Sequence, residues 1–186
     1  MNSCWPTIFN WKGLLVRTTL LVLLFVMLVT TVQGADTKDK NLKRMVTKLV
    51  ERQKIVDVVN TLYMSTDAKD WHTVANLFTN DVHFDVRSMG AKAVEQKSGD
   101  DIAKGWQEGL KSVDQVFHQS GNFIVNQWGS KAEVNCYAIA THYLPKTDFK
   151  ERTFVGSYEY GLVKVNGQWK INKFVYRNKY IHPPFE

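Results

Sequence analysis

Apolar residues recur at steps of three and four positions over residues 46–63, which is the spacing of one face of an α-helix. The polar residues Arg52, Lys54 and Asp57 fall on the opposite face, and the pattern ends at residues 65–67. The pattern predicts a first helix that buries Val46, Leu49, Val50, Ile55 or Val56, Val59, Leu62 and Tyr63.

Two shorter helices and a strand are predicted next. Residues 71–78 keep a helical pattern, and Asp70 stands where an N-cap is expected. A third helical stretch follows Ser98, and the two aspartates in its first turn suit the positive end of a helix dipole. Between these helices, residues 82–87 alternate between apolar and polar positions and predict a strand.

The rest of the chain, from about residue 114, is predicted as strands. The Asn166-Gly167 pair is typical of a hairpin turn. Four long runs, separated by turn signals, cover residues 116–128, 132–144, 152–165 and 168–181. Three helices followed by long strands predict an α+β fold, in which three N-terminal helices pack on a curved, mainly antiparallel sheet.

The predicted strand over residues 132–143 is apolar on both faces. One face carries mainly small residues and His142, and the other carries tyrosine, isoleucine and threonine. A sheet with two apolar faces needs helices over one of them and packs against or encloses something on the other. A curved sheet wrapped by helices would leave a concave apolar cavity of ligand size.

The N-terminal residues predict a targeting segment. Residues 20–32 form an apolar run, preceded by Lys12 and Arg17, and residues 32–34 suit cleavage before Ala35. An uncleaved signal anchor is the alternative, because residues 13–32 have about the length that a bilayer requires. The protein is therefore expected to be secreted or to lie in the lumen of the secretory pathway, or else to be a signal-anchored membrane protein.

The domain organisation follows from this leader. We expect residues 1–34 to be a signal peptide or signal anchor, residues 35–46 a polar N-terminal segment that is frayed over residues 35–41, and residues 47–182 the folded domain. Contact with a membrane is expected only through the N-terminal segment, if it stays uncleaved.

Charge and cysteine content exclude several classes of function. The net charge is +6, and the scattered basic residues form no arginine-rich helix with interleaved aromatic residues, so no nucleic-acid partner is expected. The basic cluster within residues 38–48 is typical of a hydrated helix start. After the leader, Cys136 is the single cysteine, which excludes an intrachain disulfide and favours a buried apolar residue over a nucleophile.

Three segments, in this order, resemble the SnoaL-like branch of the NTF2-like superfamily. Residues 57–86 carry an acidic residue after the first helix, then Asp-Trp, an apolar stretch ending in Phe and a turn with Asp. Residues 117–125, FHQSGNFIV, place a His and an Asn at the opening of a long strand, and residues 157–174 form a tyrosine-rich hairpin. The resemblance covers residues 47–180 and implies a conical α+β barrel with an open mouth.

The resemblance also implies candidate catalytic residues. The family includes dehydratases, dehydrochlorinases, polyketide cyclases, isomerases and proteins with no known chemistry. In its similar catalytic members an Asp near the end of the first helix orients a His at the start of a long strand, and the matching positions are Asp67 and His118. Such a pair would make His118 a general base and Asp67 its orienting residue. From the residues alone, Asp67 is more typical of an exposed turn residue, and His118 could be a strand residue bonded to the backbone.

Two positions depart from the family pattern. Phe174 stands roughly where a dehydrochlorinase of this type has an arginine, and Arg177 should face the other way from it. Leu62 stands where some dehydratases have a tyrosine, and Tyr63 and Tyr137 are the candidates to replace it.

Seven further residues are predicted to contact a substrate. His142 is either a second proton donor or a structural histidine. The predicted contacts are Tyr63, Trp71, Phe84, Trp106, Tyr137, His142 and Phe174. No spacing among the histidines fits a metal site, and the chain has no glycine-rich phosphate loop and no nucleophile elbow, so neither metal nor cofactor is expected.

The sequence thus predicts a domain that binds a small apolar or carbonyl-bearing molecule. If the domain is an enzyme, it is expected to be a cofactor-free lyase or isomerase of the dehydratase type. The alternatives are a non-catalytic carrier or dimerisation module of the same fold, and a signal-anchored subunit whose open sheet face pairs with a partner. A homodimer is expected, because members of the resembled family often dimerise.

Overall fold

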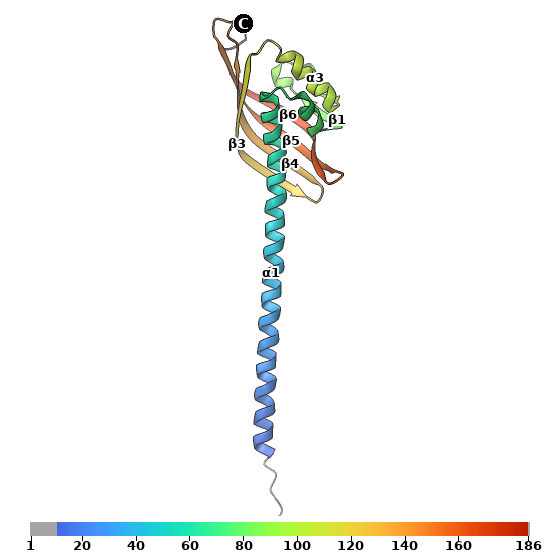
Figure 1. Cartoon of the computed structure of the whole chain (residues 1–186), viewed down its shortest axis with the longest axis vertical. Helices are drawn as coiled ribbons and strands as arrows, with labels where there is room; N and C mark the ends of the chain where they lie inside the picture. The colour runs from blue at the N-terminus through green and yellow to red at the C-terminus, as the bar shows by residue number, and fades with distance from the viewer. Residues whose placement is uncertain (1–10, 186) are drawn as a thin grey trace, which may run out of the picture. The chain divides into compact units, whose positions relative to one another are not determined.

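The structure is a computed structural model that describes the backbone of residues 11–185 and the side chains of residues 37–185. It divides into two compact units, residues up to Leu49 and residues from Val50 onward. The elements, labelled in Figure 1, are α1 (Trp11–Asp67), α2 (Trp71–Leu77), β1 (Phe78–Asp85), the 3₁₀ helix η1 (Arg87–Met89), β2 (Glu95–Lys97), α3 (Gly99–Gly109), β3 (Gln115–Trp128), β4 (Lys131–Tyr143), β5 (Glu151–Val165) and β6 (Gln168–His182).

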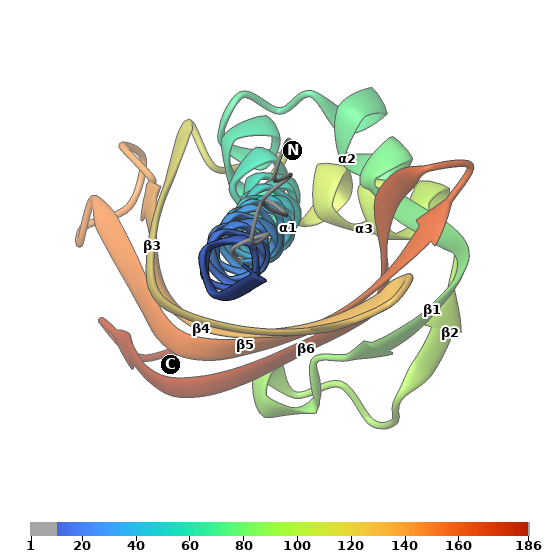
Figure 2. The same cartoon turned by 90° about the horizontal axis from the view of Figure 1, so that it is seen from below.

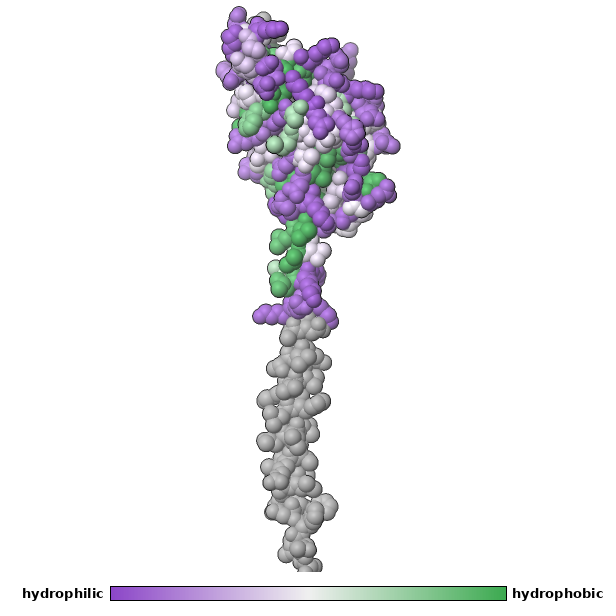
Figure 3. Space-filling view, viewed as in Figure 1, coloured by the Kyte–Doolittle hydropathy of each residue, from purple (hydrophilic) through white to green (hydrophobic). Residues whose placement is uncertain are grey.

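The first unit is helical where a frayed segment was expected. Residues 35–46 belong to α1, and an ion pair of 2.7 Å between Lys43 and Asp39, one turn apart, supports the helix there. Val46 and Leu49, predicted as buried, are exposed, and Figure 3 shows the apolar side chains of this stretch at the surface. The prediction was wrong here, because α1 is the only element described within this unit and no second element of the unit packs on its apolar face.

The predicted signal peptide or signal anchor, residues 1–34, lies outside the residues whose side chains the structure describes. Its cleavage therefore stays a prediction. Within residues 37–185, whose side chains the structure describes, no helix is long and apolar enough to cross a membrane.

The second unit is built on one six-stranded sheet of order β2-β1-β6-β5-β4-β3. All neighbouring strands are antiparallel except β1 and β6, which run parallel. Figure 2 shows the sheet curving around the C-terminal part of α1, with α2 and α3 beside it. The predicted α+β class, with three helices on a curved and mainly antiparallel sheet, is confirmed, and the sheet is not closed.

The concave face of this sheet carries the core. Ile55, Val59 and Leu62 of α1 are buried against alternating small residues of β4 and aromatic residues of β5 and β6. The predicted helix face is therefore buried from Ile55 onward, and Val50 is exposed. Hydrophilic residues cover most of the face of this unit seen in Figure 3.

Side chains at three positions along α1 form hydrogen bonds to the edge strand β3. Arg52 donates to the carbonyl of Phe123 at 3.4 Å. Ser120 donates to the amide oxygen of Asn60 at 3.2 Å. Asp67 at the end of the helix accepts two hydrogen bonds from His118. Because β3 has no further strand beside it, these contacts take the place of a neighbouring strand at this edge.

Both predicted helix caps are present. The carboxylate of Asp70 accepts from the backbone N–H of Thr73 at 3.1 Å at the start of α2. Ser98 and Asp101 form a capping box at the start of α3. Gly99 allows α3 to approach α2 closely, since a Cβ there would collide with the carbonyl oxygen of Ala75. These caps fix where the two short helices begin and so place α3 over the cavity.

The strand predicted over residues 82–87 begins earlier. β1 starts at Phe78, where the sequence pattern suggested the end of a helix and a turn. Pairing of Phe78 with Ile171 of β6 draws these residues into the sheet. The short strand β2 was not predicted, because its three residues are all polar and show no alternation of apolar and polar positions.

Candidate functional site

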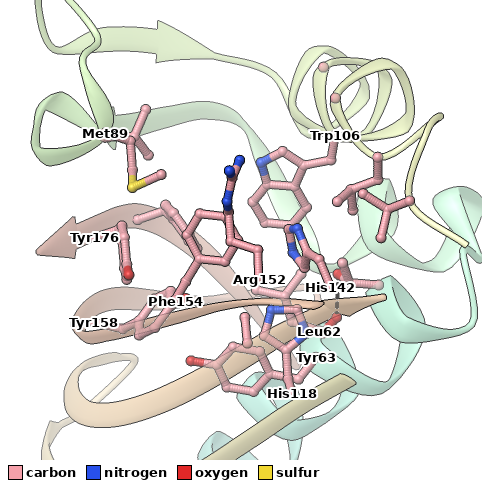
Figure 4. Close-up of a pocket in the computed structure, with 18 of the residues that line it drawn as sticks. Leu62, Tyr63, Met89, Trp106, His118, His142, Arg152, Phe154, Tyr158 and Tyr176 are labelled. Carbon is pink, nitrogen blue, oxygen red and sulfur yellow. Dashed lines mark hydrogen bonds between the residues drawn. The ribbon is translucent and has the colours of Figure 1, made fainter. Parts of the chain in front are cut away.

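A cavity of about 460 Å³ lies on the concave side of the sheet, within the usual range for ligand sites. Its wall is mostly apolar and combines residues from the end of α1, from η1 and α3, and from β3 to β6. Figure 4 shows aromatic and histidine side chains from these elements converging on one space. The predicted ligand-sized cavity is therefore present in the described part of the chain.

His118 and Asp67 meet at this wall. The Nδ1 atom of His118 lies 2.6 Å from Oδ1 of Asp67, and the backbone N–H of His118 donates to Oδ2 at 2.9 Å. Both side chains are largely buried, with 11% and 18% exposed. A carboxylate that bonds the ring and the backbone of one residue holds that ring in a single orientation.

This contact selects the tautomer of His118. Because Nδ1 donates to the carboxylate, Nε2 is left as the basic nitrogen, and no other described side chain is bonded to it. His118 lines the cavity, whereas Asp67 lies behind it. The two residues have the geometry that the base hypothesis requires, and their catalytic role stays a prediction.

Tyr63 forms the floor under the imidazole of His118. The two rings stack with centroids 5.0 Å apart and planes 26° apart. The Tyr63 hydroxyl accepts from the hydroxyl of Tyr160 at 2.8 Å and lies 3.8 Å from Sγ of Cys136. Burial raises the pKa of Tyr63 well above its usual value. Tyr63 therefore offers its ring to the site, and its hydroxyl is held in the core as a neutral group.

Cys136 belongs to this buried cluster. Burial raises the pKa of its thiol to about 11, so the thiol is protonated at neutral pH. This agrees with the interpretation of Cys136 as a buried apolar residue.

His142 also lines the cavity, as predicted. Its ring centroid lies 4.6 Å from that of Phe154. Burial, and next the charge of the nearby His118, lower the pKa of His142 to about 4. His142 is therefore neutral at physiological pH, and the second histidine adds no charge to the cavity.

Trp106 and Phe174 complete the predicted contacts that do line the cavity. Their ring centroids are 5.4 Å apart at an angle of 61°, an edge-to-face arrangement that makes a stiff apolar wall.

Three of the predicted substrate contacts, Tyr137, Phe84 and Trp71, do not line this cavity, and their contact with a substrate stays a prediction. Tyr137 alternates with the buried Cys136 and so faces outward, with Nζ of Lys179 at 4.4 Å from its ring centroid. Phe84 is buried behind the wall and stacks on Phe174 at 5.2 Å. Trp71 packs at the edge of the core.

Several lining residues escaped the sequence analysis. Arg152 is the most consequential, because it brings a permanent charge to an apolar wall. Its strand position is paired with His142, so the two residues share one face of the sheet. This register was the signal that could have identified it. The other lining residues not predicted include Met89, Phe154, Tyr158 and Tyr176.

The ring of Tyr176 depends on a glycine in the next strand. A Cβ at Gly156 would collide with that ring and come within 2.7 Å of the Arg177 carbonyl oxygen. Gly156 therefore makes room for an aromatic side chain at the mouth of the cavity.

Arg177 does not enter the cavity, in agreement with its predicted orientation. Its guanidinium donates to Oδ2 of Asp85 at 2.9 Å, and Arg87 binds the same carboxylate with two side-chain N–H groups. Hydrogen bonding to Arg87, and also to Arg177, holds the pKa of Asp85 well below its usual range. Asp85 thus fastens β1, the segment after it and β6 together.

Among the described residues, no group of three or more His, Cys, Asp or Glu side chains is placed to hold a metal ion.

Solved structures share this fold at low sequence identity. The Kfla4162 protein from Kribbella flavida aligns with a TM-score of 0.69 and 15% identity over 73% of this chain and 95% of its own. A candidate scytalone dehydratase from Novosphingobium aromaticivorans aligns with a TM-score of 0.65 and 20% identity over 75% and 91%. The hexachlorocyclohexane dehydrochlorinase LinA-type3 from Novosphingobium barchaimii aligns with a TM-score of 0.60 and 14% identity over 75% and 96%. At such identities the likeness shows the fold alone.

No curated protein sequence matches the chain significantly. The model of the SnoaL-like domain family, in contrast, matches residues 47–175, which include the whole of the Asp67–His118 pair and most of the cavity. The chain therefore belongs to the SnoaL-like domain family and has the NTF2-like fold.

Proposed function

We propose that the domain is a cofactor-independent lyase or isomerase of the dehydratase type, acting on a small apolar or carbonyl-bearing molecule. One observation carries this proposal: an imidazole whose Nδ1 is bonded to a carboxylate stands at the wall of an apolar cavity with its Nε2 unoccupied. That arrangement suits a general base.

In this mechanism, Nε2 of His118 takes a proton from a carbon atom of the substrate. The electron pair of the broken C–H bond either forms a C=C bond as a leaving group departs with its own pair, or forms an enolate when the carbon lies next to a carbonyl. The carboxylate of Asp67 holds the Nδ1–H and stabilises the imidazolium that forms. Such help is worth roughly 10²- to 10⁴-fold in rate.

The wall of the cavity favours this chemistry for small apolar substrates. The neutral His142 and the tied hydroxyl of Tyr63 leave few competing polar groups beside the base. The aromatic wall of Trp106 and Phe174 can hold a ring-sized body against Nε2 of His118.

Two of the similar solved structures carry names of eliminating enzymes, a scytalone dehydratase and a dehydrochlorinase. These names support the reaction class by analogy of fold, and the argument for this chain rests on its own pair of residues.

The proposal is tested by hydrogen–deuterium exchange at carbon. The purified domain is incubated with 2-tetralone in D₂O, and loss of the proton signals next to the carbonyl is followed by NMR. We expect exchange above the buffer rate, and His118→Ala should lower the enzymatic part roughly 10²- to 10⁴-fold. His72→Ala, on α2 and outside the cavity lining, is the matched control and should exchange like the wild type.

Equal exchange by the wild type and His118→Ala would overturn the proposal. Binding of the ketone with no exchange above the buffer rate would instead support the carrier alternative.

We also propose that the domain acts outside the cytosol, because its N-terminal residues have the features of a secretory leader. The intact mass of the protein isolated from its own cells tests this proposal. A chain beginning at Ala35 is expected, and an uncleaved chain found in the soluble cytosolic fraction would contradict it.

A further inference from the structure

Arg152 is a charged residue in a wall that is otherwise mostly apolar. It lies at the start of β5, directly opposite His142 in the register of β4 and β5. Figure 4 shows its side chain among the lining residues, with the guanidinium between Met89 and Trp106 in that view. The charge is therefore presented to the same space as the imidazole of His118.

The guanidinium lacks a charged partner among the described residues. Its carbon lies 4.5 Å from the ring centroids of both Phe149 and Phe185. Its Nη2 donates to the carbonyl oxygen of Pro184 at 3.4 Å, and its buried Nε has no hydrogen-bond partner. A buried donor without a partner is costly, so this group has bonding capacity that the described residues do not use.

Arg152 differs in this respect from Arg87 of η1 and Arg177 of β6. Arg87 and Arg177 both bind the carboxylate of Asp85. The carboxylate of Asp67, in contrast, binds His118 and makes no bond to Arg152. The cavity thus holds a cation for which the described residues supply no carboxylate partner.

We propose that Arg152 binds a carboxylate group of the ligand, so that the cavity takes small molecules with a ring-sized apolar body and one carboxylate. The planar guanidinium presents parallel N–H donors that match the two oxygens of a carboxylate. The aromatic side chains of Phe149 and Phe185 flank the guanidinium and restrict where it can move.

The register of the sheet gives the distance between His118 and Arg152 that the ligand has to span. His118 is paired with Ala140, and Arg152 with His142, two residues further along β4. Two strand spacings and two residues place the Cα atoms of His118 and Arg152 roughly 12 Å apart. Both side chains reach inward, so a ring with one substituent spans the gap. As a statement about the substrate of the proposed lyase or isomerase, this inference rests on the proposed function.

The test compares two probes of one shape, 2-naphthoate and 2-naphthamide, by isothermal titration calorimetry at neutral pH. The wild type is expected to bind the carboxylate roughly ten- to a hundred-fold more tightly than the amide. Arg152→Gln should remove this preference and leave the affinity for the amide nearly unchanged. Arg152→Lys keeps the charge without the planar pair of donors and should retain part of the preference.

Lys179→Gln is the control for net charge, because Lys179 lies over Tyr137 on the outer face of the sheet. It should leave the preference intact. Thermal unfolding of each variant shows that the fold is kept, and Arg152→Lys provides the measurement if Arg152→Gln fails to fold. Equal affinity for the two probes in the wild type, absence of binding at millimolar concentration, or an unchanged preference in Arg152→Gln would overturn the inference.

His118→Ala separates this inference from the proposed function. It should keep the carboxylate preference while losing proton exchange. A wild type that prefers the carboxylate through Arg152 but exchanges no proton would refute the lyase or isomerase and leave the carboxylate site standing.

Discussion

Asp67 and Asp85 both bind basic side chains, and the two sites differ in what they leave unused. Asp67 binds a single residue, His118, whose Nε2 remains available at the cavity wall. Asp85 binds Arg87 and Arg177 and is itself 1% exposed. The first arrangement leaves a basic atom facing a ligand space, and the second uses its carboxylate entirely to join backbone segments.

A charge that is paired with an opposite charge does not by itself mark a functional site. The pKa of Asp85 is strongly perturbed, yet its partners lie outside the cavity. What distinguishes the Asp67 pair is the position of an unbonded nitrogen in an apolar cavity. We therefore expect changes at Asp67 to affect turnover first and changes at Asp85 to affect stability first.

The largest effect is expected from Asp67→Asn. The amide is neutral and can present N–H to Nδ1, so the ring loses both its preferred tautomer and the stabilisation of its protonated form. We expect kcat to fall at least about 10²-fold. Steady-state kinetics on the substrate found by the exchange assay measures this. A loss confined to KM would contradict an orienting role for Asp67.

A smaller effect, on stability and not on turnover, is expected from Asp85→Ala. Two arginines lose a buried acceptor, and the free energy of unfolding should fall by roughly 2–4 kcal/mol. Urea unfolding measures the loss, and Asp148→Ala in an exposed loop is the matched control. If Asp85→Ala instead lowered kcat by as much as Asp67→Asn at unchanged stability, the two sites would not differ in the way described.

The stability that Asp85 provides should depend on pH. Its pKa in the folded protein lies below the ordinary value of 3.8, mainly because Arg87 donates to it, so protonation favours the unfolded chain. The contribution is complete above that ordinary value and is lost as the pH falls toward the folded pKa. The difference in unfolding free energy between the wild type and Asp85→Asn should therefore shrink in acid. A difference that stays constant below pH 3.8 would argue against an ionised Asp85 in the fold.

The smallest effect is expected from Tyr63→Phe. The substitution keeps the ring that stacks on His118 and removes the hydroxyl from its buried contact with Tyr160. We expect a loss of about 1 kcal/mol in stability and a change in kcat of no more than a few-fold. Thermal unfolding and kinetics on the same sample check both. A large fall in kcat would mean that the Tyr63 hydroxyl takes part in the reaction, which would contradict the role inferred from its burial.

Much of the fold could be predicted because local patterns and packing agree. The caps at Asp70 and Ser98 and the hairpin at residues 166–167 are local signals, and the structure contains them. The Asp67–His118 contact joins residues far apart in sequence and was anticipated through resemblance to a family, since no local pattern pairs a helix end with a given strand.

The rest of the site depends on register and on what covers each face. The alternation around Tyr137 does not indicate which face of the strand is concave, and the structure places Tyr137 on the outer face. Arg152 was missed because its orientation follows from pairing with His142, and pairing is set by tertiary structure. The apolar residues Val46 and Leu49 keep the helical spacing and are nevertheless exposed.

The contact between Asp67 and His118 also affects the open edge of the sheet. The backbone N–H of His118 belongs to the edge strand β3, and Asp67 occupies it from the end of α1. Exposed N–H groups on an edge strand are templates for strand addition by another chain. The carboxylate that orients the imidazole therefore also occupies one exposed donor of the edge strand, and we expect the loss of Asp67 to lower solubility.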